Sequence, residues 1–405
     1  MVIIGKWNHN SVTLSMKPNC TTFSINQQKR TDVYSFDLKG RLWTAMIDKI
    51  SYRRGLDGKF VAKWLDKNNL AQRQWIVGEE AATITQNARK FVADFYVAFL
   101  SQEVELDSSL SPDDTKTIEN IIHFTDQDYQ IDIRRYQQIY KPVGILPPDQ
   151  YFSVVLQAAE GCSFNKCNFC NFYRDRKFHI KTPDEFRKHC EDIRDFFGEG
   201  LSLRRTIFLG DANALVIPMP KLIALCEIVH EIYDVDQLGG IYAFLDGFSG
   251  DKKSVADYKK LASLGLTRIY IGLESGYDPL LKFLNKPGNA ASAVEAVKSM
   301  KAGGVSVGII ILLGAGGHQF EEAHIKDTIR VLNEMHLGAD DLIYFSELIE
   351  HENSDYSKNA YDHQLLPLNQ NERILQGNKI ESGLKFTLQT GTPHISRYDI
   401  REFIY

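Results

Sequence analysis

Three closely spaced cysteines are the residues of this chain best suited to chemistry. They stand in Glu160-Gly-Cys-Ser-Phe-Asn-Lys-Cys-Asn-Phe-Cys-Asn-Phe-Tyr173, a C-x4-C-x2-C pattern directly after the apolar run 152–159. Cysteine thiolates hold iron–sulfur clusters, and a four-iron cluster has four iron corners to fill. Three thiolates leave one iron open for a substrate or cofactor. The pattern therefore predicts that Cys162, Cys167 and Cys170 hold a [4Fe-4S] cluster that takes part in chemistry.

A zinc site is the alternative interpretation of this triplet, with His179 as a fourth ligand. Structural zinc sites are tetrahedral and usually combine two ligand pairs, such as C-x2-C and a second pair further along the chain. The sequence shows no second pair near the three cysteines. The count of ligands therefore favours iron–sulfur over zinc.

The elements that must position the cysteines alternate between strand-like and helix-like segments from about residue 150 onward. Apolar runs predict six strands, at 152–157, 205–210, 240–245, 268–273, 305–313 and 342–348. A helix is predicted to start at Thr182-Pro-Asp-Glu185, a capping box with proline in the first turn. This alternation predicts an α/β fold with parallel strands. Six consecutive units favour an incomplete (β/α)6 barrel over a flat doubly wound sheet.

Polar residues follow the predicted strands where a barrel would place its active site. Gly210-Asp-Ala-Asn213 follows the second strand, and Gly272-Leu-Glu-Ser-Gly276 follows the fourth. Asp211 and Asn213 are candidate acceptors for a ligand, although Asp-Ala-Asn is also a common turn composition. Ser275 has an alternative role as a helix cap.

A charged and aromatic segment follows the cysteines. It contains Tyr173, Arg174, Arg176, Lys177 and His179. These side chains are expected either to line the substrate side of the site or to form a solvated loop, because loops are commonly charged.

The cysteine loop and the strand-end motifs resemble the radical S-adenosylmethionine (radical SAM) superfamily. Its commonest signature is C-x3-C-x2-C with an aromatic residue before the last cysteine. Phe169 takes that place, and this chain has one residue more between Cys162 and Cys167. The run 269–286 is similar to the branch of coproporphyrinogen oxidase-like and tRNA-modifying proteins. The resemblance covers roughly residues 150–350 and implies the incomplete barrel, but it does not identify the substrate.

The resemblance implies a [4Fe-4S] cluster whose open iron binds the amino and carboxylate groups of S-adenosylmethionine. An external one-electron donor such as flavodoxin or ferredoxin would drive cleavage to methionine and a 5′-deoxyadenosyl radical, which abstracts hydrogen from a substrate. The implied cofactor contacts comprise the loop after the second strand, the loop after the fourth, two residues of the fifth strand that could equally be core, and two aromatic shields. These residues are Gly210, Asp211, Asn213, Glu274, Ser275, Ile310, Leu312, Phe169 and Phe172.

Two other functions stay open from the sequence. One is a haem-binding chaperone or carrier, a role thought to occur in a branch near the coproporphyrinogen oxidases. The other is an RNA-modifying radical SAM enzyme, which a basic, aromatic surface on the N-terminal domain would support and a small closed pocket would oppose. The D-x-H-x-x-G pattern of B12-binding proteins is absent.

Length and composition set the remaining expectations. A chain of 405 residues exceeds one usual domain. The interpretation divides it into a small N-terminal α+β domain of unknown role at 1–145, the barrel at 146–350 and a short C-terminal extension at 351–405. A net charge of −5 gives no general basic field for nucleic acid.

The apolar segments and the three remaining cysteines indicate the cellular compartment and the number of iron–sulfur clusters. The apolar N-terminal run is too short for a signal peptide, and the longest apolar stretch is too short to span a bilayer. A soluble, cytoplasmic protein is expected, because the triplet needs reducing conditions. Cys190 and Cys226 fall on apolar helix faces and Cys20 stands alone. One cluster is therefore predicted.

Overall fold

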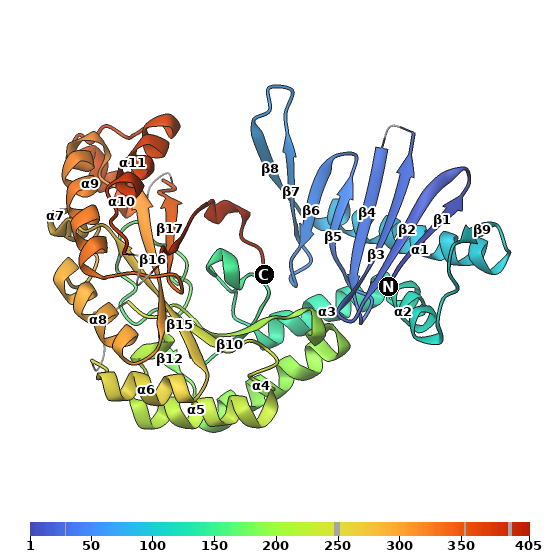
Figure 1. The fold of residues 1–405 in the computed structure, drawn as a ribbon, viewed down its shortest axis with the longest axis horizontal. Coiled ribbons are helices and arrows are strands. Elements are labelled where there is room, and N and C mark those ends of the chain that lie inside the picture. Colours follow the sequence, from blue (N-terminus) through green and yellow to red (C-terminus); the bar gives the residue numbers. More distant parts are fainter. Residues whose placement is uncertain (29, 247–251, 352–353, 388–390) are drawn as a thin grey trace. The chain divides into compact units, whose positions relative to one another are not determined.

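A computed structural model describes residues 1–28, 30–246, 252–351, 354–387 and 391–405 of the chain (Figure 1). It divides into two compact units. Unit 1 comprises Met1–Val143, Glu191–Arg205 and Glu402–Tyr405, and unit 2 comprises Gly144–Cys190 and Thr206–Arg401. The domain boundaries at residues 145 and 350 stay a prediction.

Unit 1 is built on a nine-stranded antiparallel sheet in the order β8-β7-β6-β5-β4-β3-β2-β1-β9. Two of its hairpins turn through residue pairs with positive φ, Asn8-His9 and Asp48-Lys49, the backbone that tight two-residue hairpins require. The strands are β1 (Val2–Trp7), β2 (Asn10–Lys17), β3 (Cys20–Gln27), β4 (Arg30–Asp37), β5 (Leu42–Ile47), β6 (Ile50–Arg54), β7 (Phe60–Leu65), β8 (Ala71–Ile76) and β9 (Val104–Leu106).

Three helices complete unit 1, namely α1 (Gly78–Leu100), α2 (Pro112–His123) and α3 (Asp126–Ile139). Capping boxes start α2 at Ser111 and α3 at Thr125. The apolar face of α1 packs with the sheet into one core, in which Phe23 and Phe95 are almost fully buried.

Unit 2 is an α/β unit, as predicted. Its seven-stranded parallel sheet has the order β10-β13-β14-β15-β16-β17-β18. The strands are β10 (Ser153–Gln157), β13 (Thr206–Gly210), β14 (Ile241–Phe244), β15 (Leu266–Glu274), β16 (Ser306–Leu313), β17 (Leu342–Glu347) and β18 (His394–Tyr398). The first six are the predicted strands, and β18 is an addition that the sequence did not reveal.

Helices connect the strands of unit 2, and several pack on the sheet (Figure 1). They are α4 (Pro183–Phe197), which continues into unit 1, α5 (Met219–Ile232), α6 (Val255–Ser263), α7 (Asp278–Phe283), α8 (Ala290–Ala302), α9 (Gly317–Glu334), α10 (Asp355–Asp362) and α11 (Gln370–Ser382). Short 3-10 turns are η1 (Pro148–Gln150), η2 (Gly198–Leu203), η3 (Ala214–Val216) and η4 (Ile400–Glu402). The predicted capping box of α4 is confirmed, because Thr182 and Glu185 exchange hydrogen bonds. Cys190 and Cys226 are buried as predicted.

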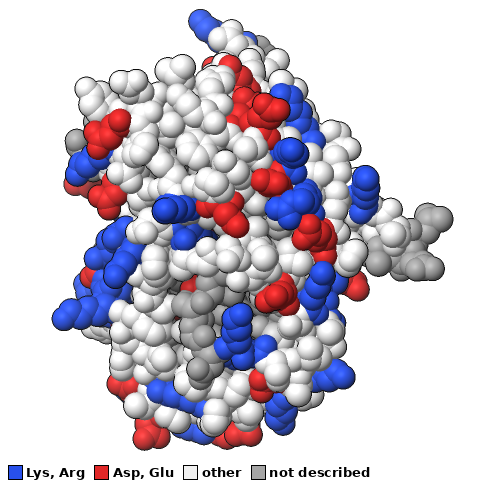
Figure 2. Space-filling view, turned by 90° about the vertical axis from the view of Figure 1, so that its left-hand side faces the viewer, with Lys and Arg blue, Asp and Glu red and all other residues white. Residues whose placement is uncertain are grey.

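Surface charges of unit 2 alternate in sign. Arg330 pairs with Glu334 along α9, and Lys379 of α11 pairs with Glu321 of α9. Figure 2 shows one face on which Lys and Arg are interspersed with Asp and Glu. Among the described residues, none of the helices is long and apolar enough to cross a membrane.

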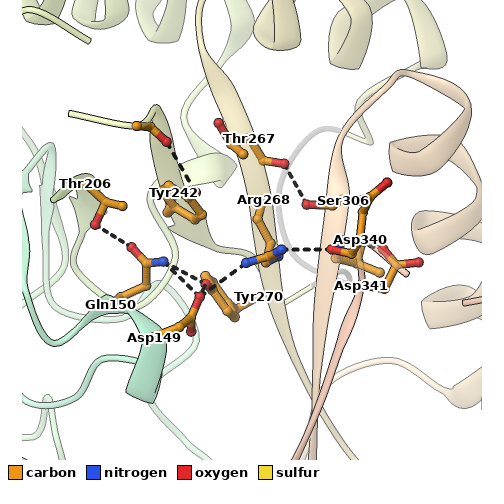
Figure 3. A network of polar contacts seen from close by, with 12 residues as sticks. Asp149, Gln150, Thr206, Tyr242, Thr267, Arg268, Tyr270, Ser306, Asp340 and Asp341 are labelled. Carbon is orange, nitrogen blue, oxygen red and sulfur yellow. Dashed lines mark hydrogen bonds and ion pairs between the residues drawn. The ribbon is translucent and has the colours of Figure 1, made fainter. Parts of the chain in front are cut away.

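A partly exposed polar network occupies the amino ends of the parallel strands (Figure 3). The Asp149 carboxylate accepts hydrogen bonds from the hydroxyls of Tyr270 and Tyr344 and pairs with Arg268 at 3.2 Å. Next to it, the Gln150 amide oxygen accepts from Thr206 at 2.8 Å. The network fixes η1 against β13, β15 and β17, and it leaves the carboxyl ends of the strands to the pocket described below.

Asp149→Asn is expected to destabilise unit 2, because one neutral amide replaces an acceptor shared by two hydroxyls and a guanidinium. Hydrogen bonds to charged groups contribute about 1.5–3 kcal/mol, and a loss of this order should appear in urea unfolding. The control is Asp236→Asn, since Asp236 is exposed. Equal unfolding midpoints for the two variants would contradict the role given to Asp149.

Candidate iron–sulfur and cofactor site

A pocket of about 400 Å³ lies at the carboxyl ends of the parallel strands of unit 2. The ends of β15, β16 and β17 contribute Glu274, Leu312 and Glu347 to its lining, and Leu245 follows β14. Active sites of parallel β/α folds gather at this end of the strands. The volume lies within the range of small-molecule sites, about 300–1,000 Å³.

The three cysteines predicted as ligands all line this pocket. Each is a free, partly exposed thiol. Burial raises the pKa of Cys167 to about 12 and also raises the pKa of Cys170. Metal binding therefore has to displace thiol protons, as it does for cysteine ligands in general.

The base of the cysteine loop is closed by a short antiparallel pair, β11 (Ala159–Glu160) and β12 (His179–Ile180). Lys181 adds an ion pair to Glu160 at 2.7 Å, and its backbone N–H donates to the carbonyl of Ala158. His179 belongs to this pair, where its ring lies 3.3 Å from Glu185. The described residues that line the pocket do not include His179.

Asp211 holds both ends of the same loop. Its buried carboxylate accepts from the Gly161 N–H at 2.9 Å, from the Gln157 amide at 2.9 Å and from Arg176 at 3.3 Å. Burial raises the pKa of Asp211, and these donors oppose the rise. Asp211 and Gly210 are not among the described lining residues. The geometry therefore gives Asp211 a positioning role.

Backbone hydrogen bonds attach the middle of the cysteine loop to the end of α7. The Asn168 N–H donates to the carbonyl of Leu284 at 3.1 Å, and the Asn168 amide donates to the carbonyl of Phe283 at 2.6 Å. The Asn285 amide donates to the carbonyl of Lys166 at 2.6 Å. These bonds fix Cys167 from the residue on either side.

Asn213 lines the pocket, and its role as a ligand contact stays a prediction. Its amide nitrogen donates to Ser163 at 2.9 Å and to the Asp246 carboxylate at 2.7 Å. Asp246 lines the pocket too, and its backbone N–H donates to the side-chain amide oxygen of Asn213 at 3.1 Å. Asn213 therefore orients Asp246, which is an anionic acceptor in the pocket.

The end of β15 presents Glu274 to the pocket through a β-bulge. Gly272 and Glu274 face the consecutive residues Ile310 and Ile311 of β16, and Glu274 has a φ of +61°. Such bulges redirect side chains next to active sites. Glu274 forms an ion pair with Lys286 at 3.0 Å, and both line the pocket.

Ser275 lies beside Glu274 but turns away from the pocket. It is fully buried, its hydroxyl lies 2.7 Å from His324 Nδ1 of α9, and it accepts from the Tyr277 N–H at 3.0 Å. The described lining residues do not include it. Its observed contacts are those of a turn.

Apolar side chains complete the wall of the pocket. Phe169, Phe172, Ile310 and Leu312 all line it. Phe169 packs against the core cluster that contains Leu312. These side chains limit the access of water, which favours the containment of reactive intermediates.

The charged segment after the cysteines is divided between two roles. Tyr173 is buried and lines the pocket. Arg174 supports the loop through the carbonyls of Cys167 and Cys170, and Arg176 contacts Asp211. Lys177 is exposed.

Several lining residues were missed in the sequence, among them Asp246, Lys286 and Tyr398. Asp246 directly follows the end of a predicted strand, a signal that could have identified it. Lys286 ends the run 269–286 without any local pattern of its own. Tyr398 lies on β18, whose five residues show no recognisable alternation.

The donor set fits an iron–sulfur cluster better than a single ion. In the described part of the chain, no group of three or more His, Cys, Asp or Glu side chains is placed to hold one metal ion. A zinc ion would require such convergence. Cluster thiolates each bind a different iron, so their sulfurs stand further apart. The geometry gives no support to zinc with His179 as a fourth ligand, because the His179 ring contacts Glu185.

Because His324 is buried, we predict that the free energy of unfolding falls at acid pH. Burial lowers the pKa of His324 from 6.5 to about 4, so between these values the unfolded chain binds more protons than the folded protein. Stability should therefore fall as the pH drops below 6.5, by about 2 kcal/mol between pH 7 and pH 5.

Urea unfolding at both pH values tests this step. His324→Asn should show a smaller fall than the wild type, whereas His394→Asn, at an exposed position, should keep the full fall. Identical pH dependence in the wild type and His324→Asn would show that another group is responsible.

Comparison with known proteins places this site in a family. Residues 156–332 match the model of the radical SAM superfamily. This segment includes the cysteine loop and the strand ends that carry Asn213, Glu274 and Leu312. A search of curated proteins finds no significant match.

The fold is also similar to solved structures, at low identity. Coproporphyrinogen III oxidase (HemN) from Escherichia coli shares 12% identity at a TM-score of 0.41, over 56% of this chain and 51% of that one. Methylornithine synthase (PylB) shares 16% at 0.39, over 60% and 70%. SuiB from Streptococcus suis shares 12% at 0.40, over 87% and 72%.

This chain thus spans about half the length of HemN. None of these likenesses identifies a substrate. The family match rests on the segment that builds the pocket: residues 156–332 are a radical SAM domain, and that family uses a [4Fe-4S] cluster and S-adenosylmethionine.

Proposed function

We propose that this protein cleaves S-adenosylmethionine reductively and uses the resulting 5′-deoxyadenosyl radical to abstract hydrogen from a substrate that the structure does not identify. The observation that carries the proposal is the meeting of three free cysteines and a buried Glu–Lys pair in one pocket. When bound, the cluster and S-adenosylmethionine supply a 5′-deoxyadenosyl radical. The electron would come from an external donor such as flavodoxin or ferredoxin.

Different residues of the chain would hold the cluster, orient S-adenosylmethionine and shield both from water. Cys162, Cys167 and Cys170 would hold three irons and leave the fourth facing the pocket. Asp246 and Glu274 are anionic acceptors suited to the ammonium or hydroxyl groups of the cofactor. The apolar side chains of Ile310 and Leu312 suit the adenine.

From the sequence, Asp211 is a candidate for contact with the cofactor. In this proposal Asp246, which Asn213 orients, makes that contact instead. Asp211 holds the loop, while Asn213 orients Asp246 toward the pocket. Ser275 supports the turn after β15. Gly210 is buried and has no side chain, so it would allow the backbone at the end of β13 to lie close to the cysteine loop.

The architecture proposed for unit 2 is the incomplete (β/α)6 barrel, extended by β18. Inward-facing aromatic rings support a curved sheet, because Phe208 of β13 contacts both Phe244 of β14 and Tyr270 of β15. Tyr398 of β18 brings the C-terminal segment to the pocket wall. A pocket of about 400 Å³ has the size of a site for a small molecule such as S-adenosylmethionine.

Anaerobic reconstitution tests the proposed activity. The wild type should bind about four irons per chain and release 5′-deoxyadenosine when given dithionite and S-adenosylmethionine, as chromatography would show. The Cys162→Ala/Cys167→Ala/Cys170→Ala variant should do neither, because no thiolate ligand remains.

Cys20→Ala is the matched control, since Cys20 is a free cysteine in unit 1. It should keep both iron and activity. Release of 5′-deoxyadenosine by the triple variant would refute the proposal, and about eight irons in the wild type would refute the single cluster.

Glu274→Gln tests the cofactor contact. The variant should keep its iron but bind S-adenosylmethionine about 1.5–3 kcal/mol more weakly, the typical worth of a hydrogen bond to a charged group. Calorimetry measures the affinity, with Glu295→Gln on the exposed surface of α8 as control. Unchanged affinity would leave Glu274 without a role in cofactor binding.

A further inference from the structure

The ion pair between Glu274 and Lys286 is almost fully removed from solvent. The side chains are 9% and 10% exposed, and Lys286 Nζ lies 3.0 Å from Glu274 Oε1. The pair folds back over Gly272, where a Cβ atom would come within 2.4 Å of the carboxylate and 3.0 Å of the ammonium. Removing two charges from water is costly, and apolar side chains of similar volume could fill the same space. Packing alone therefore does not explain why an ion pair is buried here.

The turn after α7 places Lys286. Asn285 adopts a φ of +50°, and the Lys286 N–H donates to the carbonyl of Leu281 at 2.9 Å. This is the Schellman arrangement that ends many helices, with asparagine in its left-handed position. The backbone thereby holds the start of the lysine side chain.

The same turn is fastened to the cysteine loop on both sides of Cys167. Asn285 donates to the carbonyl of Lys166, and Asn168 donates to the carbonyl of Leu284. Segment 284–286 and segment 166–168 therefore move as one body. A cation carried by the first keeps a constant position relative to the thiolate carried by the second.

Electrostatics agree with this geometry. Burial alone would lower the pKa of Lys286, but the negative charge of Glu274 raises the pKa above its ordinary value. Lys286 is therefore an ammonium ion at neutral pH, beside one carboxylate and one cluster ligand.

We propose that the Glu274–Lys286 pair sets the reduction potential of the cluster, a role that rests on the proposed function. Reduction adds one electron from the external donor and breaks no bond, so the cluster gains one negative charge. A buried cation favours the reduced cluster and a buried carboxylate opposes it, because Coulomb energies are large where water is excluded. Net charge and solvent exposure are established determinants of cluster potentials.

Opposite shifts from two substitutions test the proposal. In redox titrations followed by EPR, without S-adenosylmethionine, Glu274→Gln should make the midpoint potential more positive. Lys286→Met should make it more negative, and the double variant should lie below Glu274→Gln. Lys282→Met is the matched control, because Lys282 is exposed on α7 four residues earlier, and its midpoint should equal that of the wild type.

Unchanged midpoints in both single variants, or shifts of the same sign, would overturn the proposal. Weaker S-adenosylmethionine binding by Lys286→Met at an unchanged midpoint would overturn it too and would make Lys286 a cofactor ligand. If Lys286→Met fails to hold a cluster, the sign of the midpoint shift in Glu274→Gln still tests the proposal. A wild type that assembles no cluster would refute the proposed function itself, whereas a cluster with unshifted midpoints would refute this inference alone.

Discussion

One buried carboxylate determines where the cysteine loop lies. Asp211 accepts from Gly161 just before the first cysteine, from Arg176 just after the last, and from Gln157 at the end of β10. An unpaired carboxylate at this depth would be costly, so its three donors are held in place together.

The parallel sheet supplies the second constraint. Parallel strands bring their carboxyl ends to one edge, so residues distant in sequence meet there. The polar network around Asp149 occupies the opposite end of the strands. The bulge at Glu274 then turns one carboxylate toward the pocket, where Lys286 pairs with it. Fold and site are thus linked through the same few strand ends.

The sequence predicted the six central strands because their apolar runs are long and bounded by glycine or polar residues. It did not reveal most of the strands of unit 1, where serine, threonine and asparagine alternate with single apolar residues, as in Asn10–Lys17. It also did not reveal β18, whose partners lie about fifty residues upstream in β17. Pairing over such distances leaves no local pattern.

The three cysteines could be predicted because their spacing is itself the signal. The separate roles of the residues around the cysteines could not be predicted from the sequence. Asp211 and Asn213 are two residues apart in one motif, yet the first holds the loop and the second faces the pocket. Lys286 depends on a helix end and a bulge that sequence alone does not place. Side-chain direction after a turn decides these roles.

The most direct test of the central claim is the EPR spectrum of the reduced, reconstituted protein before and after addition of S-adenosylmethionine. Three cysteine ligands leave one iron open, so the account predicts a single cluster signal whose g-values change when the cofactor binds that iron. A cluster signal that S-adenosylmethionine leaves unaltered would contradict an open iron in this pocket.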